Sequence, residues 1–420
     1  MHLKKNKHRS VFSANLPMSI SIRTLLGTVF IWSFLCGCRT SVTNSETTDS
    51  SDSTENLYVR VAGKDPLRLL TDRPPNLETP LKYFRYDLTP NEAFFIRWHL
   101  SGLPTSVDST TFRLSIAGHV NKTLSLSLHD LKTKFKPVKM VALCQCAGNA
   151  RSVFNPRVPG AQWVNGGMGN AEWTGVRVKD ILEMAGAKQG AVCVSFNGLD
   201  APPMNTVPDF VKSLSYNHAA DGEVMIAYEM NGKSLPLLNG YPLKLVVPGW
   251  YATYWVGMLN EITVHADTFK GYWMEKAYLI PRHSTNGDEK PDVLATDLVP
   301  IGKMDVRSIF VTPEPGSILI KGAAQHIEGL AFDGGDGIVK VEISDDSGKT
   351  WNAAKLFSSL GKYSWRRWSY EYTPINDGEI KLWVKATNTT GETQPWHQWN
   401  RSGYMRNEIE SLPLNVRHEK

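Results

Sequence analysis

The residues most informative for chemistry are a cysteine and an arginine that lie five positions apart. Cys146 follows an apolar run that begins at Val141 and predicts a buried strand, and it stands before the turn-forming tripeptide Ala-Gly-Asn. A thiolate is a soft metal ligand, and the planar guanidinium of Arg151 can hold an oxyanion by forked hydrogen bonds. The end of this strand therefore carries a candidate metal ligand beside a candidate anion clamp.

A second group of candidate residues lies upstream, in the segment 91–100. Arg97 and His99 are two positions apart, so a strand through this segment would place both side chains on the same face. Taken alone, two cations with this spacing fit a half-exposed strand better than they fit a functional site. The pair becomes informative only in combination with Cys146.

The cysteines do not form an obvious disulfide framework. Two of the five, Cys36 and Cys38, lie at the end of an N-terminal leader and directly after it, which leaves Cys144, Cys146 and Cys193. An odd number argues against simple pairing in an exported protein. Cys144 and Cys146 share one face of the predicted strand, so a Cys-x-Cys copper site or a redox pair is an alternative, although no cluster of His or Met follows. Cys193 lies in an apolar stretch and is expected to be a core residue.

The stretch around Cys146 resembles the signature of the sulfite oxidase family of molybdenum enzymes, in which Cys-Ala-Gly-Asn precedes a basic pair. The resemblance implies that the Cys146 thiolate binds the metal of a molybdenum–molybdopterin cofactor. It also implies that Arg151 binds the substrate. Ala150 replaces the first residue of the usual basic pair, so only one member of that pair is present.

The family's Phe-x-Arg-x-His pattern also occurs here, at residues 95–99. The resemblance implies that Arg97 and His99 take part in catalysis and that Arg97 also binds the substrate. The resemblance implies that Lys244, further along the chain, serves the pterin phosphate, because a basic side chain pairs with the negative charge of a phosphate. Many relatives carry a lysine where Gly257 stands, so this loop could offer only backbone N–H groups. The implied cofactor contacts are Phe95, Arg97, His99, Cys146, Asp200, Asn239, Lys244 and Trp255.

Three further side chains are implied to face the substrate. Trp163 matches a tryptophan of the family's substrate pocket. Tyr278 matches a catalytic tyrosine that points at the metal-bound oxygen, and Tyr272 in the same aromatic-rich segment competes for this role. Residues 403–407 resemble bacterial sulfite dehydrogenases, in which an arginine of this region reaches toward the active site. Arg406 is the matching residue, and a structural salt bridge is the alternative for it.

Local patterns predict the elements that hold these residues. The segment 155–175 is rich in Gly and Pro and predicts a functional loop, and 176–185 has the apolar spacing of an amphipathic helix. The alternating segment 192–199 predicts a strand. Within 223–233, the dipeptide Asn231-Gly232 predicts the tight turn of a β-hairpin.

Alternating apolar and polar residues predict an all-β region near the C-terminus. In 338–344, Val339 and every second residue after it would face the core of a strand-built domain. Short strands of this kind, separated by turns, are typical of an immunoglobulin-like sandwich. The predicted fold class is an α+β molybdopterin-binding domain of the sulfite oxidase type at 57–293, followed by an all-β, immunoglobulin-like dimerisation domain at 294–420.

The net charge of +5 comes entirely from the N-terminal leader. Residues 1–37 hold five basic residues and no acidic one, which leaves 41 basic and 41 acidic residues in the rest of the chain. Proteins that bind nucleic acid through charge usually carry a clear basic excess. The mature chain has none, so no nucleic-acid partner is expected.

The leader itself predicts export and anchoring. A basic stretch precedes the apolar run 25–35, and the following Leu-Cys-Gly-Cys resembles a bacterial lipobox. Cleavage there would make Cys38 the lipidated first residue; an ordinary secretion signal or a short anchor is the alternative. Residues 38–56 are rich in Ser, Thr and Asp and predict a flexible tether. The expected location is the periplasmic side of a bacterial membrane.

The resemblance implies oxidation of sulfite to sulfate, with single electrons passed to a separate cytochrome c. The sequence contains no Cys-x-x-Cys-His motif, so no attached haem is expected in this chain. The sandwich implies a homodimer. One alternative is a periplasmic molybdenum-dependent reductase of S-oxides, although such relatives usually lack the sandwich. A lipid-anchored binding protein without cofactor is the other, and the retained Cys146 argues against it.

Overall fold

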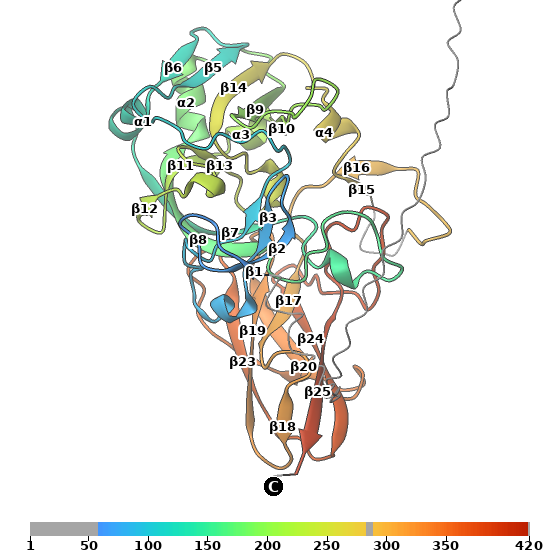
Figure 1. The fold of residues 1–420 in the computed structure, drawn as a ribbon. Helices are drawn as coiled ribbons and strands as arrows, with labels where there is room; N and C mark the ends of the chain where they lie inside the picture. The colour runs from blue at the N-terminus through green and yellow to red at the C-terminus, as the bar shows by residue number, and fades with distance from the viewer. Residues whose placement is uncertain (1–57, 283–288, 419–420) are drawn as a thin grey trace, which may run out of the picture. The chain divides into compact units, whose positions relative to one another are not determined.

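The computed structural model describes residues 58–282 and 289–418. The predicted signal peptide at 1–37, the predicted tether at 38–56 and the lipidation site Cys38 lie outside the described residues. In the described segments, no helix is long and apolar enough to cross a membrane. These segments consist mostly of strands joined by loops, with few and short helices (Figure 1).

The first large sheet of the N-terminal part combines parallel and antiparallel pairing. Its last strand along the chain pairs in parallel with one neighbour and antiparallel with the other. The predicted strand at 192–199 is confirmed as a member of this sheet. In order across the sheet, the strands are β10 (Lys212–Ser215), β9 (Cys193–Gly198), β14 (Leu259–His265), β5 (Leu114–Gly118) and β6 (Leu124–Leu126).

The second large sheet carries the strand that leads to Cys146. The predicted hairpin is confirmed, because Asn231 and Gly232 both have positive φ angles, 52° and 72°, as a two-residue turn requires. The predicted loop at 155–175 is shorter than expected, because its last part belongs to a strand. The strands are β12 (Lys233–Ser234), β11 (Met225–Met230), β8 (Met168–Arg177) and β7 (Val138–Gln145), with β13 (Lys244–Val246) also pairing with β11.

A small sheet at the start of the described chain holds Arg97. The segment 91–100 contributes only two residues to it, so the long strand predicted there is wrong. The residues before Ile96 form a turn instead, and backbone bonds such as Ala93 N to Pro90 O (3.0 Å) hold it. The strands are β1 (Tyr58–Val59), β2 (Leu67–Thr71), β3 (Asn76–Glu78) and β4 (Ile96–Arg97).

The helices are short and cover sheet edges and loops. The helix predicted at 176–185 is confirmed from Val178 onward, and it buries the apolar face that its spacing indicated, ending at Gly186 with φ of 64°. The α-helices are α1 (Leu128–Lys134), α2 (Val178–Ala185), α3 (Tyr216–Ala219) and α4 (Tyr272–Glu275). The 3₁₀ turns are η2 (Leu81–Arg85), η3 (Arg151–Val153), η4 (Leu237–Asn239) and η5 (Ala252–Tyr254).

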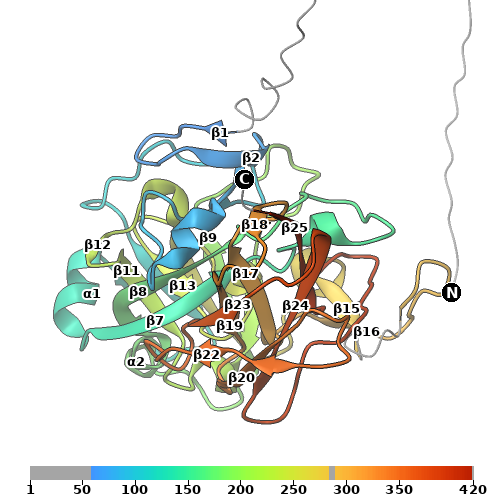
Figure 2. The same ribbon diagram turned by 90° about the horizontal axis from the view of Figure 1, so that it is seen from below.

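The C-terminal part is an all-β sandwich, as its alternating pattern predicts (Figures 1 and 2). Its two sheets enclose a separate apolar core that includes Trp368 and Leu382, neither of which is exposed. One sheet is β17 (Arg307–Thr312), β19 (Gln325–Phe332), β23 (Arg366–Tyr372) and β22 (Lys355–Leu356). The other is β18 (Ile318–Ile320), β25 (Glu410–Arg417), β24 (Gly378–Asn388), β20 (Ile338–Ser344) and β21 (Asn352–Ala353).

One residue of the sandwich faces the opposite way from its prediction. Val339 is 54% exposed, whereas Ile338 and Val341 are buried. The pairing of β20 with β24 shifts register between Ile338 and Lys340, which marks a bulge. A bulge inserts one extra residue and so reverses the side chains before it. The simple alternation is therefore wrong at Val339 and right from Val341 onward.

Two strands flank the boundary predicted between residues 293 and 294. β15 (Leu279–Pro281) pairs antiparallel with β16 (Leu298–Pro300). The boundary falls within the connection between them and stays a prediction. Because β15 directly follows Tyr278, this pairing also helps to fix the position of that tyrosine.

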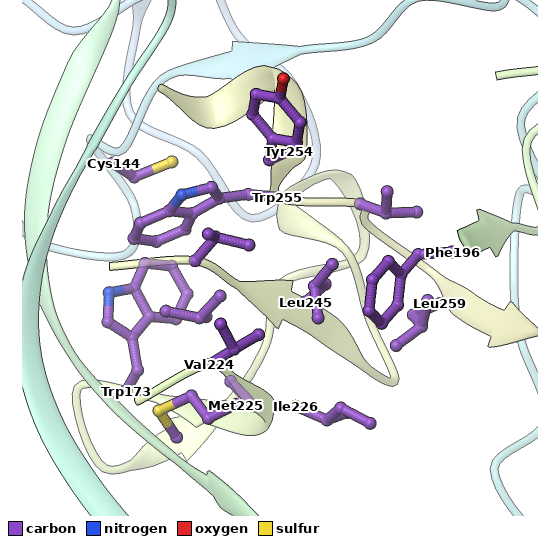
Figure 3. Close-up of a cluster of buried hydrophobic side chains, with 14 of the residues drawn as sticks. Cys144, Trp173, Phe196, Val224, Met225, Ile226, Leu245, Tyr254, Trp255 and Leu259 are labelled. Carbon is purple, nitrogen blue, oxygen red and sulfur yellow. The ribbon is translucent and has the colours of Figure 1, made fainter. Parts of the chain in front are cut away.

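The core of the N-terminal part packs large aromatic rings between β7, β8 and η5 (Figure 3). Trp173 and Trp255 meet edge to face, with ring centroids 5.6 Å apart and an interplanar angle of 75°. Cys144 lies beside them in the same cluster. A large apolar side chain that is fully buried contributes roughly 1.5–3 kcal/mol. The end of β7 that leads to Cys146 is therefore packed against buried aromatic rings.

Candidate active site

Cys146 lies one residue beyond β7, on a loop held by hydrogen bonds to a neighbouring segment. Its N–H donates to Gly167 O (2.8 Å), and its carbonyl accepts from Asn149 N (3.0 Å). The Asn149 side chain ties the same segments together, because its Oδ1 accepts from Gly167 N at 2.9 Å. The thiol is therefore presented by a fixed turn, and the residue is only 7% exposed.

Arg151 follows a residue in the left-handed region, Ala150, with φ of 65°. Its Nη1 donates to Ala161 O (3.1 Å) and its Nη2 to Ser402 O (3.3 Å). Its Nε is buried without a hydrogen-bond partner among the described residues. A Cβ on Gly148 would lie 2.6 Å from Nη2, and one on Gly160 would lie 2.7 Å from Nη1. Glycines thus form a close-fitting cradle for the guanidinium.

Arg97, His99 and Tyr278 form a hydrogen-bonded group opposite the thiol. Nη2 of Arg97 donates to the Tyr278 hydroxyl at 2.8 Å, and Nε2 of His99 is hydrogen-bonded with the same hydroxyl. The His99 ring stacks on Phe210, with centroids 3.5 Å apart. Tyr278 has φ of 58°, an unusual conformation for a residue other than glycine. Such backbone strain often accompanies a functional site.

Burial sets the protonation states of this group. Burial, together with the nearby charges of Arg97 and Lys212, holds the pKa of His99 well below its usual range. Burial raises the pKa of Tyr278. At neutral pH the imidazole is therefore neutral and the phenol keeps its proton. Arg97 is the positive charge of the group, and the tyrosine hydroxyl can donate to an anion.

Two cavities meet at these side chains. The inner cavity is lined by Phe95, Asp200, Lys244 and Trp255, among others. The outer cavity is lined by residues that include Arg151, Trp163 and Tyr404. The residues shared by both linings are Arg97, His99, Cys146 and Tyr278. The thiol implied to bind the metal thus stands where the two cavities join.

The inner cavity has the polar groups that a buried anionic cofactor requires. The hydroxyl oxygen of Thr253 is buried, has no hydrogen-bond partner among the described residues and belongs to a residue of the lining. Burial lowers the pKa of Lys244, as expected for an ammonium group that lacks a partner charge. Burial raises the pKa of Asp200 to about 7. The unpaired hydroxyl of Thr253 and the basic side chain of Lys244 are groups that a molybdopterin with its phosphate can use.

Close packing explains why a small residue stands at position 257. A Cβ there would lie 3.0 Å from the Trp98 ring and 3.1 Å from the Cα of Gly240. The backbones of Gly257 and Lys244 form an isolated β-bridge, which holds the two chains close together. A larger side chain at position 257 would require these neighbours to move by a few tenths of an ångström. Lys244 is the lysine that faces this cavity instead.

Asn239 lines the inner cavity, but its amide is engaged by the protein. Its Nδ2 donates to Phe95 O at 2.9 Å, and its Oδ1 accepts from Nζ of Lys64. Lys64 Nζ also donates to Asn91 O (2.6 Å) and Phe94 O (3.1 Å), so all three ammonium protons have acceptors. Asn239 and Lys64 therefore hold the backbone that carries Phe95, with one amide proton left for the cofactor.

Arg406 does not reach either cavity. Its guanidinium bonds Glu408 at 3.0 Å and Glu410 at 2.7 Å, and Glu410 also binds Arg307 at 2.5 Å. Arg307 in turn donates to Asn165 Oδ1 at 2.6 Å, next to the segment that supports Cys146. The expectation that Arg406 binds substrate stays a prediction, while its alternative, a structural salt bridge, is present in the structure. Arg406 belongs to a buried ion-pair network that joins the sandwich to the N-terminal part.

The structure also bears on the choice between Tyr272 and Tyr278 and on the state of the cysteines. Tyr272 is 48% exposed, whereas Tyr278 lies at the junction of the cavities. Cys144, Cys146 and Cys193 are free thiols. No group of three or more His, Cys, Asp and Glu side chains is placed to hold a metal ion in segments 58–282 and 289–418. Cys193 is buried, as expected of a core residue.

Sequence reasoning did not identify three residues near the site. Lys64 and Lys212 are lone lysines in otherwise ordinary segments, and Tyr404 is one of fourteen tyrosines. Lys212 is fully buried and donates to Trp273 O at 2.7 Å, with its ammonium 5.2 Å from the centre of the Tyr278 ring. No local pattern distinguishes these residues, because their partners are remote in sequence.

Comparisons with known proteins agree with this arrangement. The model of the oxidoreductase molybdopterin binding domain matches residues 100–273, and the model of the Mo-co oxidoreductase dimerisation domain matches residues 299–411. The predicted order of a molybdopterin-binding domain and an immunoglobulin-like domain is confirmed. The helical content is smaller than an α+β class suggests. The solved structure of the sulfane dehydrogenase SoxCD from Paracoccus pantotrophus shares the fold, with a TM-score of 0.70, 24% identity and coverage of 90% of this chain and 96% of that chain.

Curated relatives cover most of the chain. Sulfite oxidase from Gallus gallus is 33% identical over 357 residues, which is 81% of this chain and 76% of the relative. Mitochondrial sulfite oxidase from Rattus norvegicus is 33% identical over 368 residues, which is 83% of this chain and 66% of the relative. The chain thus spans about two thirds of the rat protein. With the Cys146 thiol at the junction of two cavities, these matches show that the chain belongs to the sulfite oxidase family of molybdopterin oxidoreductases.

Proposed function

We propose that this protein oxidises sulfite to sulfate at a molybdenum–molybdopterin centre and passes the electrons singly to an external cytochrome c. The observation that carries the proposal is the junction of the two cavities, where a thiol lies beside anion-binding groups. The name of the matched C-terminal domain supports a homodimer. The similarity to sulfite oxidases supports the substrate.

The charge of the outer cavity favours a small anion. Its described lining includes Arg97, Arg151 and Lys276 and contains no Asp or Glu. Arg401 also lies there, but the carboxylate of Glu289 already pairs with it. Positive groups in a partly enclosed cleft attract an anionic substrate and strengthen each charge-assisted hydrogen bond. Sulfite, with three oxygens and a sulfur lone pair, has the charge and size for this end of the cavity.

Different residues would hold the cofactor in the inner cavity and the substrate in the outer cavity. Cys146 would hold the metal, while Lys244 and Trp255 contact the pterin in the inner cavity. When bound, the molybdenum centre supplies oxygen-atom transfer and accepts the two electrons that the oxidation releases. Arg97 and Arg151 bind and orient the sulfite oxygens, which lowers the entropy cost of reaction. The ring of Trp163, only 1% exposed, shields the site from water.

Tyr278 and His99 would act at the junction itself. The oxygen of the Tyr278 hydroxyl accepts a hydrogen bond from Arg97, so the proton of the hydroxyl remains available for another acceptor. A neutral His99 that carries its proton on Nε2 can donate to the hydroxyl oxygen, and the hydroxyl can then donate to an oxygen of the substrate. Because the raised pKa of Tyr278 keeps it protonated at neutral pH, its role is that of a hydrogen-bond donor.

Purified holoprotein tests the proposal directly. It is expected to contain stoichiometric molybdenum and to reduce cytochrome c only when sulfite is present. Metal analysis and the absorbance change of the cytochrome are the two measurements. Reduction of methionine sulfoxide without oxidation of sulfite would assign the protein to S-oxide reduction instead. If protein purified from a host that makes the cofactor contains no molybdenum, the chain would instead be a binding protein without cofactor.

The location is proposed from the leader alone. Cys38 is expected to carry a lipid on the periplasmic side of a bacterial membrane, because a lipobox-like sequence precedes it and a polar tether follows. Mass spectrometry of the mature N-terminus, from a bacterial host, should find an acylated Cys38. The Cys38→Ala variant should leave the membrane fraction. An unmodified mature chain that begins at another residue would contradict this proposal.

A further inference from the structure

A segment of the C-terminal part enters the outer cavity between residues 400 and 405. It is attached to the Cys146 loop, because Met405 N donates to Ala147 O at 2.8 Å. It also contacts Arg151, whose Nη2 donates to Ser402 O at 3.3 Å. The side chain of Ser402 adds a bond to Leu279 O at 3.2 Å, immediately after Tyr278. The segment is therefore joined to both sides of the candidate substrate site.

Asn400 holds the turn that presents Tyr404. Its Oδ1 accepts from Tyr404 N at 3.2 Å, and its Nδ2 donates to Tyr404 O at 2.9 Å. Gly403 has φ of 58°, which a glycine adopts at little cost. A Cβ at Gly403 would lie 2.9 Å from Cγ of Arg151. The backbone of Tyr404 is thus fixed, and its side chain is aimed by tertiary contacts.

The ring of Tyr404 contacts two residues of the site at once. It stacks on Tyr278, with centroids 5.0 Å apart and an interplanar angle of 17°. The guanidinium carbon of Arg151 lies 4.9 Å from its centroid, within the range of a cation–π contact. Tyr404 lines the outer cavity, as do Arg97 and Arg151. Burial raises its pKa, so the hydroxyl keeps its proton at neutral pH.

We propose that Tyr404 is an anion-binding residue of the substrate site, contributed by the C-terminal domain. Its hydroxyl donates a hydrogen bond to an oxygen of the sulfur oxyanion that Arg97 and Arg151 hold. This inference rests on the proposed function, and it assigns to Tyr404 the role expected of Arg406. A neutral donor next to two guanidinium groups contacts an oxygen without adding another charge to the buried site. Hydrogen bonds to a charged acceptor are about twice as strong as neutral ones, so the contact would favour the anion.

The test removes the hydroxyl and keeps the ring. In molybdenum-loaded holoenzyme, Tyr404→Phe should raise KM for sulfite about tenfold while kcat stays within about twofold, since a lost hydrogen bond to a charged group weakens binding to this degree. The affinity for sulfate, the product oxyanion, should fall about as much. It is measured at fixed ionic strength through tryptophan fluorescence, because Trp163 and Trp273 line the same cavity. The matched control is Tyr272→Phe, an exposed tyrosine outside the lining, which should change neither value.

The outcomes separate this inference from the proposed function. Wild-type KM and wild-type sulfate affinity in Tyr404→Phe, at unchanged molybdenum content, would overturn the role of Tyr404 and leave sulfite oxidation intact. If the wild type does not oxidise sulfite but its sulfate affinity depends on the hydroxyl, the proposed function fails and Tyr404 remains an anion-binding residue. If Tyr404→Phe lowers kcat alone, the residue acts on the ring of Tyr278 rather than on the anion, and the proposal is wrong.

Discussion

Replacement of Cys146 by serine is expected to reduce sulfite turnover to the background rate, whereas replacement of Cys144 by alanine should preserve most of it. Cys146 stands at the junction of the two cavities, one residue past the end of β7. A serine hydroxyl is a hard oxygen donor and does not replace a soft thiolate at the metal. The measurements are sulfite-dependent cytochrome c reduction and molybdenum content of the same preparation.

Cys144 is the matched variant, because it lines only the inner cavity and packs beside Trp255. Burial raises the pKa of its thiol to about 12, so the thiol stays protonated at neutral pH. Cys144→Ala should lose some stability, in the range of about 1 kcal/mol that small core truncations cost. If Cys144→Ala is inactive and Cys146→Ser is active, the metal ligand has been assigned to the wrong cysteine.

The second largest effect is expected at Arg151, where Arg151→Gln should bind sulfite far more weakly than Arg151→Lys. Lysine keeps the charge but loses the planar fork, which the cradle of Gly148 and Gly160 fits closely. Losing one hydrogen bond to a charged group costs roughly 1.5–3 kcal/mol, and about 1.4 kcal/mol is a factor of ten. Arg151→Lys should therefore raise KM about tenfold or more, and Arg151→Gln should exceed that because the charge is also lost.

A neighbouring arginine provides the control for charge alone. Arg157 lies on the same loop, is exposed and bonds Gln162 Oε1 at 3.1 Å, and it does not line the outer cavity. Arg157→Gln removes one positive charge from the surface and should leave KM unchanged at fixed ionic strength. The assay is again sulfite-dependent reduction of cytochrome c. If Arg151→Gln binds and oxidises sulfite like the wild type, Arg151 is not the anion clamp.

Features that depend on neighbours along the chain could be predicted from the sequence. The apolar spacing of α2, the Asn231-Gly232 turn and the alternation of β20 from Val341 onward each require only local geometry. Cys146 and Arg151 are five positions apart on one loop, so their proximity also follows from the chain itself. The family motif then linked this loop to a cofactor. These predictions succeed because a few backbone angles decide them.

Pairing between strands changed predictions that local patterns supported. The bulge in β20 exposes Val339, although the alternation around it indicates a core residue. The segment 91–100 has strand-like spacing, yet only Ile96 and Arg97 find a partner strand. A strand exists only where a neighbour accepts its backbone hydrogen bonds. The sequence of one segment does not contain that information.

The thiol, the arginine after it and the order of the two domains can all be read from the sequence, and they define the chemistry available to this protein. Which remote side chains join them depends on the packing of the folded chain. Tyr404 and Arg406 are two residues apart, yet the first enters the outer cavity and the second enters an ion-pair network with Glu410. Lys64 was likewise found only through its contact with Asn239, 175 positions away. Local patterns report the direction of a side chain relative to its own backbone, whereas its partner depends on how distant segments pack.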